Sequence, residues 1–190
     1  MAMAARQESS ETNGINVNQL TKTIDAIKQD PRKANAHFGA RTIWKGGSQT
    51  ETSIQSFAIG GKEETSRKQP FLLQGDEPAV LLGEDKAPSS VEAVLHALGS
   101  CLTVSFIDSA AMKGIQIDSL VFVLEGDLDL RGFLGIDKSV RPGYRSIRAT
   151  CNVKADASQE QIAQLCKDAQ ERAPVMDMLV NPVNVEVQMG

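Results

Sequence analysis

The spacing of apolar residues first separates a short helical segment from a strand-rich region. Between residues 15 and 33, apolar side chains recur at helical spacing until Pro31 stops the run. This pattern predicts a short amphipathic helix. From about Asn35 to Leu82 the apolar runs are short, partly alternating and twice closed by Gly-Gly turns. We therefore expect three or four antiparallel strands joined by hairpins in this region.

The most apolar segment of the chain begins near Ser89 and ends at Gly114. Ser89 and Glu92 have the spacing of a capping box at a helix start, and Gly114 suits the position after a helix end. The span between them carries almost no charge, and as a helix it would be roughly 35 Å long. It is too polar for a membrane span and too apolar for a surface helix, so it predicts a central buried helix.

The remaining sequence predicts two long strands, a second helix and a last strand. The strands are expected at 117–132 and 143–156 with a loop between them, and the helix follows Ser158 and ends near Pro174. Alternating residues at 181–189 then predict the final strand. This order favours an α+β fold. We expect a disordered segment at 1–14, a helical appendage at 15–33 and one domain at 34–190.

Composition and charge remove several classes of function. The 190 residues are 41% hydrophobic and 23% charged, as in ordinary soluble proteins, and the net charge is −4. A nucleic-acid partner is not expected, because phosphate binding needs a basic face and the cations here are scattered. No apolar run reaches the length of a membrane span or a signal peptide, so we expect no membrane association and a cytoplasmic location.

Three cysteines are the only strong candidates for chemistry. Cys101, Cys151 and Cys166 are odd in number and far apart, which argues against a disulfide framework and favours thiols. The chain has only two histidines and no Cys-x-x-Cys pair, so we expect neither a metal site nor a bound cofactor.

The segment from Val91 to Cys101 resembles the central-helix motif of the OsmC/Ohr family, and Glu92 to Cys101 carry the match. Its sequence is VEAVLHALGSC. The downstream order of two strands and a helix ending in Arg-Ala-Pro-Val agrees with this resemblance, which covers about 34–190. It implies an intertwined homodimer with the long helices in its core and the sites at the subunit interface. It also implies a peroxidatic cysteine, here Cys101, that reduces hydroperoxides and is held as a thiolate by an arginine and a glutamate.

The sequence departs from this family pattern at three positions. The second, resolving cysteine is replaced by Ala173. Ser48 stands after the Gly46-Gly47 turn, where the family often has its arginine. The carboxylate of the peroxidases would fall at Val91, whereas Glu92 is nine residues before Cys101 and half a helical turn away from it.

Each candidate residue therefore has a catalytic and a structural interpretation. Cys101 is either the nucleophile or an inert packed thiol. Glu92 is either a catalytic carboxylate or a helix cap. The preferred cation is Arg41, on the first strand, with Arg141 and Arg145 as alternatives to it.

Two functions remain open at this point. The first is a one-cysteine peroxidase in which Cys101 reduces an organic hydroperoxide and an external thiol reduces the resulting sulfenic acid. The second is a non-catalytic dimeric protein that binds a small hydrophobic ligand. The homodimer is expected in both cases, because the apolar helix needs more cover than one small sheet provides.

Overall fold

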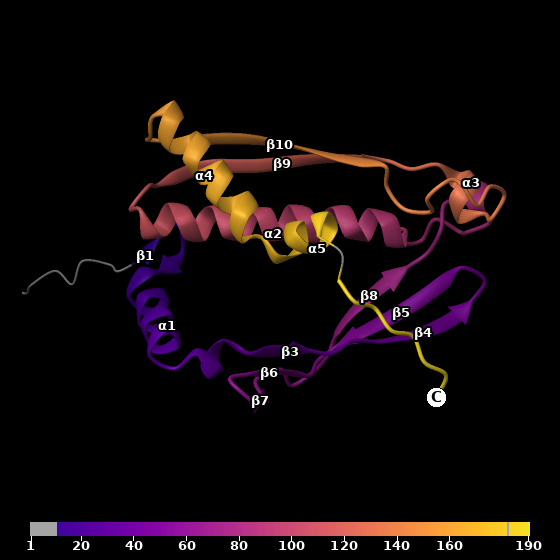
Figure 1. Ribbon diagram of the computed structural model, residues 1–190, viewed down its shortest axis with the longest axis horizontal. Helices are drawn as coiled ribbons and strands as arrows, with labels where there is room; N and C mark the ends of the chain where they lie inside the picture. Colours follow the sequence, from indigo (N-terminus) through magenta and orange to yellow (C-terminus); the bar gives the residue numbers. More distant parts are fainter. Residues whose placement is uncertain (1–10, 182) are drawn as a thin grey trace, which may run out of the picture. The chain divides into compact units, whose positions relative to one another are not determined.

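A computed structural model describes residues 11–181 and 183–190 of the chain. These residues form two compact units, which we describe one at a time. The first unit combines the described residues up to Val17 with those from Val94 onwards. The second unit comprises Asn18–Ala93. The elements of both are labelled in Figure 1.

The first unit is built on a long helix and a long hairpin. Helix α2 (Ser90–Met112) contributes all but its opening turn to this unit. Strands β9 (Ile117–Asp127) and β10 (Ser146–Ala155) run side by side as an antiparallel pair, and α4 (Gln159–Arg172) and α5 (Pro174–Val180) follow them (Figure 1). The two long strands, the central helix and the second helix thus lie where the sequence predicts them.

The core of this unit lies where α2 and α4 meet the hairpin. Phe106 and Ala110 of α2 and Leu165 and Ala169 of α4 are fully buried and pack together. The ring of Phe106 meets Phe122 of β9 edge to face, with centroids 6.4 Å apart. Apolar residues at helical spacing on α4 and at alternating positions on the strands therefore form one continuous core.

The ends of these helices follow the signals in the sequence. Ser158 and Gln161 form a complete capping box at the start of α4. Ala173 ends α4, and Pro174 starts α5 as its first residue. Proline fits a first helical position because its missing N–H has no partner there in any helix. Gly114 follows α2 with a φ of 68°, the left-handed conformation that favours glycine.

The second unit contains helix α1 and two small antiparallel sheets. Helix α1 spans Val17–Gln29, within the range that the sequence predicts. One sheet has the strand order β3-β6-β7 and the other has the order β4-β5-β8. Their bounds are β3 Ala36–Phe38, β4 Arg41–Gly46, β5 Gln49–Ile54, β6 Phe57–Ile59, β7 Lys62–Glu64 and β8 Phe71–Gly75.

Three expectations about local structure are corrected. The region 35–82 contains six strands rather than three or four, because strands of three residues are too short to give a clear alternation. The loop between β9 and β10 contains a short helix, α3 (Leu130–Phe133). The prediction of a final strand is wrong, because residues 183–190 have no regular secondary structure. A strand needs a hydrogen-bonded neighbour, and none of the described strands pairs with these residues.

The Asn13 side chain links the hairpin at residues 11–16 to the segment that follows α2. Strands β1 (Glu11–Thr12) and β2 (Ile15–Asn16) form a small hairpin. Between them, the Asn13 amide donates to the carbonyl of Ile115 and accepts from the N–H of Ile117, both at 2.8 Å. Of the segment expected to be disordered, residues 1–10 lie outside the described residues, whereas 11–14 form this hairpin.

A buried carboxylate organises the loop that precedes α2. Asp76 accepts hydrogen bonds from the Ser48 hydroxyl at 2.6 Å and from the backbone N–H groups of Glu77, Glu84 and Lys86. The Ser48 hydrogen bond, helped by the three N–H donors, lowers the pKa of Asp76 from 3.8 to about 2. This side chain is 3% exposed, so the four donors replace the water that the carboxylate loses.

By length and composition, α2 would be able to cross a membrane, with a mean hydropathy of 1.5 over its most apolar stretch. The core helix of a soluble protein meets the same criterion. Only 17% of that stretch is buried within the chain, and Val104 is 58% exposed. The central helix therefore forms as predicted, but a single chain covers little of it.

Candidate functional site

The start of α2 is fixed by the capping box that the sequence predicts. The Ser89 N–H and hydroxyl both donate to the Glu92 carboxylate, at 2.8 and 2.7 Å, and the Glu92 N–H approaches the Ser89 hydroxyl at 3.5 Å. The Ser89 hydroxyl and N–H lower the pKa of Glu92 below its usual value. The carboxylate is therefore engaged as a helix cap, which supports the structural interpretation of this residue.

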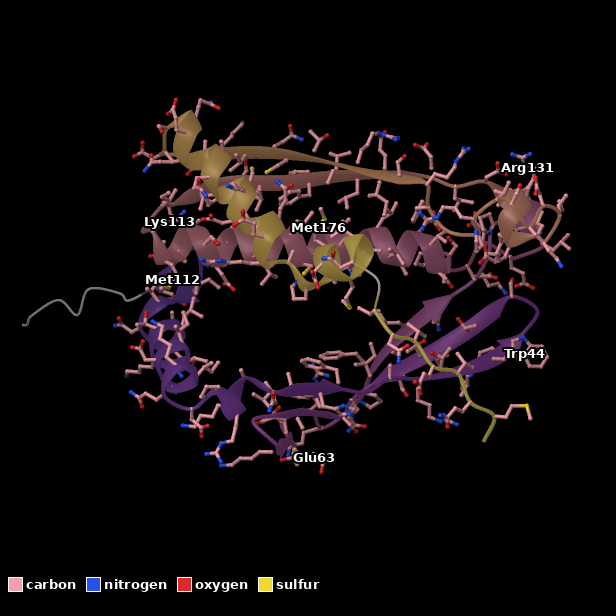
Figure 2. All side chains as sticks on the ribbon, in the orientation of Figure 1. Trp44, Glu63, Met112, Lys113, Arg131 and Met176 are labelled. Carbon is pink, nitrogen blue, oxygen red and sulfur yellow. The ribbon has the colours of Figure 1, made fainter. Side chains whose placement is uncertain are left out.

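Cys101 lies in the fourth turn of α2 with its side chain half-buried. Its thiol packs against a cluster built on Leu98, Leu102 and Ala173. Partly buried residues of β9, β10 and α5 complete this cluster, among them Met176, which is labelled in Figure 2. The surroundings of the sulfur are therefore mainly apolar, and at least one side of it remains accessible.

Ala173 shares this cluster with Cys101, although 72 positions separate them in the sequence. Its side chain is 1% exposed and lies at the end of α4, just before Pro174. The fold thus brings the cysteine of the central helix to the position where the family resemblance places a second thiol. In this chain a methyl group occupies that position.

Arg41, the preferred cation, is in a different compact unit from Cys101. It begins β4, and its backbone carbonyl accepts from the Ser53 hydroxyl at 3.4 Å. Within the described residues its guanidinium has no ion-pair partner. Of the alternatives, Arg145 lies 4.0 Å from the Asp129 carboxylate in the loop after β9, so part of its charge is compensated locally.

Comparison with known proteins now decides the family. The family model described as OsmC-like protein matches residues 83–188, more than half of the chain. The chain belongs to this family. The OsmC-like match contains α2, the long hairpin, α4 and both Cys101 and Ala173. A search of curated protein sequences gave no match.

Solved structures support the OsmC-like fold at low sequence identity. An OsmC-like protein from Mycoplasma pneumoniae has a TM-score of 0.58 and 16% identity, over 77% of this chain and 89% of that one. An organic hydroperoxide resistance protein OsmC from Legionella pneumophila has a TM-score of 0.54 and 15% identity, over 79% and 93% of the two chains. The fold is therefore shared with OsmC-like proteins, among them one named for hydroperoxide resistance.

Sequence reasoning missed one arginine of this OsmC-like chain. The Arg67 guanidinium lies over the rings of Phe57 and Phe71, 4.5 and 5.1 Å from their centroids. Its Nη1 is buried and has no hydrogen-bond partner within the described residues. Buried N–H donors are nearly always paired, so this nitrogen is available to an acceptor that the chain itself does not supply. The sequence gives no signal for it, because the two aromatic residues come from separate strands.

Sequence reasoning also missed that the two other cysteines are neighbours. Cys151 of β10 and Cys166 of α4 pack against the same buried cluster, which is not the cluster that contains Cys101. Cys166 therefore does not take the place of the missing second thiol. Among the described residues, no group of three His, Cys, Asp or Glu side chains is arranged to hold a metal ion.

A cavity of about 680 Å³ lies in the second unit, between α1 and the turn that joins β6 to β7. Its lining combines four cationic side chains with one carboxylate and a few apolar groups, and it contains none of the candidate catalytic residues. Such a lining suits an anionic ligand better than an apolar one. The residues are Gln19, Lys22, Thr23, Ala26, Ile27, Asp30, Arg32, Lys33, Ile59, Gly60 and Lys62.

Proposed function

We propose that this OsmC-like protein is a homodimeric one-cysteine peroxidase, in which Cys101 reduces organic hydroperoxides and an external thiol regenerates it. The observation that carries the proposal is the pairing of Cys101 with Ala173 in one buried cluster. By the family resemblance this cluster corresponds to a two-thiol centre, and in this chain it contains one thiol. A sulfenic acid formed at Cys101 then has no thiol at position 173 to condense with, so the reductant comes from solution.

The reaction needs two steps at one sulfur. The Cys101 thiolate attacks an oxygen of the hydroperoxide, the O–O bond breaks, and the alkoxide leaves with a proton as the alcohol. The Cys101 sulfenic acid then reacts with one external thiol, which releases water and gives a mixed disulfide. A second external thiol attacks that disulfide, returns Cys101 to the thiol form and leaves as the oxidised reductant.

The first step needs a cation, because an apolar environment disfavours the thiolate. We assign this role to Arg41, whose guanidinium has no ion-pair partner within the described part of the chain. Arg67 is the second candidate, because its buried Nη1 lacks an acceptor among the described residues. Glu92 contributes by capping α2, and a role in orienting the arginine stays open to it.

Unsatisfied apolar surface on several elements supports the homodimer. Helix α2 is apolar on most sides, but only 17% of its most apolar stretch is buried. Phe71, Leu72 and Leu73 of the edge strand β8 are 55–61% exposed. The alternating residues of 183–190 are exposed as well and form no strand. A second copy of the chain would cover all three features.

The assembly is tested by measuring the mass of the purified protein in solution. Light scattering after size exclusion should give twice the 20.4 kDa of one chain, without a monomer peak at micromolar concentration. A stable monomer would refute the dimer and leave α2 exposed to water.

The chemistry is tested on a variant in which Cys101 is the only cysteine, made by Cys151→Ala and Cys166→Ala. Stopped-flow mixing with cumene hydroperoxide should consume the Cys101 thiol much faster than it consumes free cysteine. Dithiothreitol should then support many turnovers. Adding Cys101→Ser to the same background gives the matched control, which should be inert. Thiol loss no faster than for free cysteine would exclude the peroxidase.

The two arginines are compared in the same single-cysteine background. Replacing the arginine that holds the thiolate should slow peroxide consumption by tenfold or more, since one unit of thiol pKa changes the thiolate fraction tenfold. Arg41→Lys and Arg67→Lys keep a charge but lose the planar donor group. We expect the larger loss at Arg41; a loss confined to Arg67 would reassign the cation.

The second candidate, a non-catalytic binding protein for a small hydrophobic ligand, remains a prediction. The cavity beside α1 does not favour it, because Lys22, Arg32, Lys33 and Lys62 line that cavity. If the single-cysteine variant proves inert towards hydroperoxides while the protein is dimeric, this binding function becomes the better explanation of the fold.

A further inference from the structure

Cys151 on β10 and Cys166 on α4 lie at similar distances from the turn that joins these two elements. Strand β10 ends at Ala155, and a short turn leads into α4 at Gln159. Cys151 is four residues before the strand end, about 13 Å back along β10. Cys166 is seven residues into the helix, about 10 Å along α4 from the same turn. Helix α4 crosses the hairpin (Figure 1), and both residues pack against the same buried cluster.

Both side chains point into the same packed layer. Along β10, Cys151 alternates with exposed neighbours and faces the core with Val153 and Ala155. On α4, Cys166 adjoins the fully buried Leu165. The two thiols pack against one cluster, which consists of Phe106, Ala110, Ile115, Leu165 and Ala169.

Cys166 is also near enough to Cys151 to influence its pKa. Burial, as the largest cause, and the neighbouring Cys166 thiol together raise the pKa of Cys151 from 9.0 to about 12. Cys151 is therefore protonated at neutral pH. Cys166 is only half-buried, so a small oxidant can reach it.

We propose that Cys151 and Cys166 form a reversible disulfide when the protein meets an organic hydroperoxide, independently of Cys101. The pair joins β10 to α4 and is a second redox site in the chain. Its formation requires no reactivity at Cys101. Cys151 and Cys166 pack against one cluster, whereas Cys101 and Ala173 belong to the other. Reversible intracellular disulfides of this kind are typically redox-sensing.

The proposed oxidation consumes two thiols and one hydroperoxide. Cys166 attacks an oxygen of the hydroperoxide and becomes a sulfenic acid, and the alcohol leaves with the released proton. Cys151 then attacks the Cys166 sulfur, so that the S–S bond forms and the hydroxyl leaves with the Cys151 proton as water. External dithiol reverses the reaction by thiol–disulfide exchange.

The test uses the full chain with Cys101→Ser, so that only the proposed pair remains. After treatment with cumene hydroperoxide the intact mass should fall by two hydrogen atoms. Trypsin should then release Ala149–Lys154 linked to Ala155–Lys167, and dithiothreitol should separate them. Since the disulfide closes a short loop, the melting temperature should rise by roughly 6–12 °C on oxidation.

Two matched controls separate this inference from the peroxidase proposal. Adding Cys166→Ala should abolish the linked peptides and the rise in melting temperature, while Cys151 stays a thiol. The single-cysteine Cys101 protein reports the peroxidase function separately, so either idea can fail alone. The inference is overturned if both thiols survive in the Cys101→Ser protein, if they oxidise without the link, or if the wild type links Cys101 to either of them.

Discussion

Restoring a thiol at position 173 tests the central geometric claim about the site. Ala173 and Cys101 pack in one cluster, so the variant Ala173→Cys should form a disulfide with Cys101 under mild oxidation. The background should lack Cys151 and Cys166, so that no other pairing competes. The variant would convert the proposed one-cysteine centre into one that resolves its own sulfenic acid.

The magnitude follows from the loop that the disulfide closes and from the space at the site. A loop of about 70 residues corresponds to about 4 kcal/mol in the chain-entropy model. The added sulfur enters a position that is 1% exposed, which costs about 1–3 kcal/mol through overpacking. That cost is present in both redox states, so oxidised and reduced protein should differ by about 4 kcal/mol, or roughly 8–16 °C in melting temperature.

The assay is thermal unfolding of the same variant with and without dithiothreitol, with free thiols counted after denaturation. Ala169→Cys is the matched control, because Ala169 lies one turn earlier on α4 and is equally buried. It packs in the cluster that excludes Cys101. We expect this control to keep both thiols and to show no difference between the two conditions.

The reasoning would be refuted by a folded Ala173→Cys protein that keeps both thiols under oxidation. That outcome would mean that the two positions are not neighbours in solution. It would also remove the argument that Ala173 occupies the place of a second thiol. A disulfide in the Ala169→Cys control would refute the assignment of the two clusters in the same way.

Three further predictions concern the stability of the fold. Phe106→Ala should lower the free energy of unfolding by about 3–5 kcal/mol in denaturant titrations, because the ring is fully buried; a cost below about 1 kcal/mol would contradict its place in the core. Ser158→Ala should cost about 1 kcal/mol by removing the cap of α4, whereas Ser158→Asp should cost little. The lowered pKa of Asp76 gives a stabilisation that is present above pH 4 and is lost as the pH falls through about 2. Melting temperatures of Asp76→Asn and wild type should therefore converge between pH 5 and pH 2, and a constant difference would show that Asp76 titrates normally.

The position of the central helix was predictable because its signals are local. Ser89 and Glu92 bond to each other three residues apart, and Gly114 takes the left-handed conformation directly after the helix. The cap at Ser158 and the break at Pro174 are local in the same sense. A capping box or a proline acts within one helical turn, so the residues alone determine where α2 and α4 begin and end.

Side-chain partnerships between distant elements could not be predicted in the same way. The sequence presents Cys101, Cys151 and Cys166 as three isolated thiols, but the fold packs Cys151 and Cys166 against one cluster and places Cys101 with Ala173 in another. It also stacks Arg67 over rings from two separate strands. No local pattern encodes these contacts, because they depend on the path of α4 over the hairpin and on the order of the strands.

The predicted final strand, which does not form, also shows that a local pattern cannot determine contacts between distant segments. Residues 183–190 alternate as a strand should, and the apolar valines among them are exposed. Alternation determines which side chains share a face, but a strand exists only where a neighbour accepts and donates its backbone hydrogen bonds. The sequence by itself thus determined the local helices and the family motif around Cys101, whereas only the tertiary structure decided which residues meet, since contacts between distant segments arise from packing rather than from local preference.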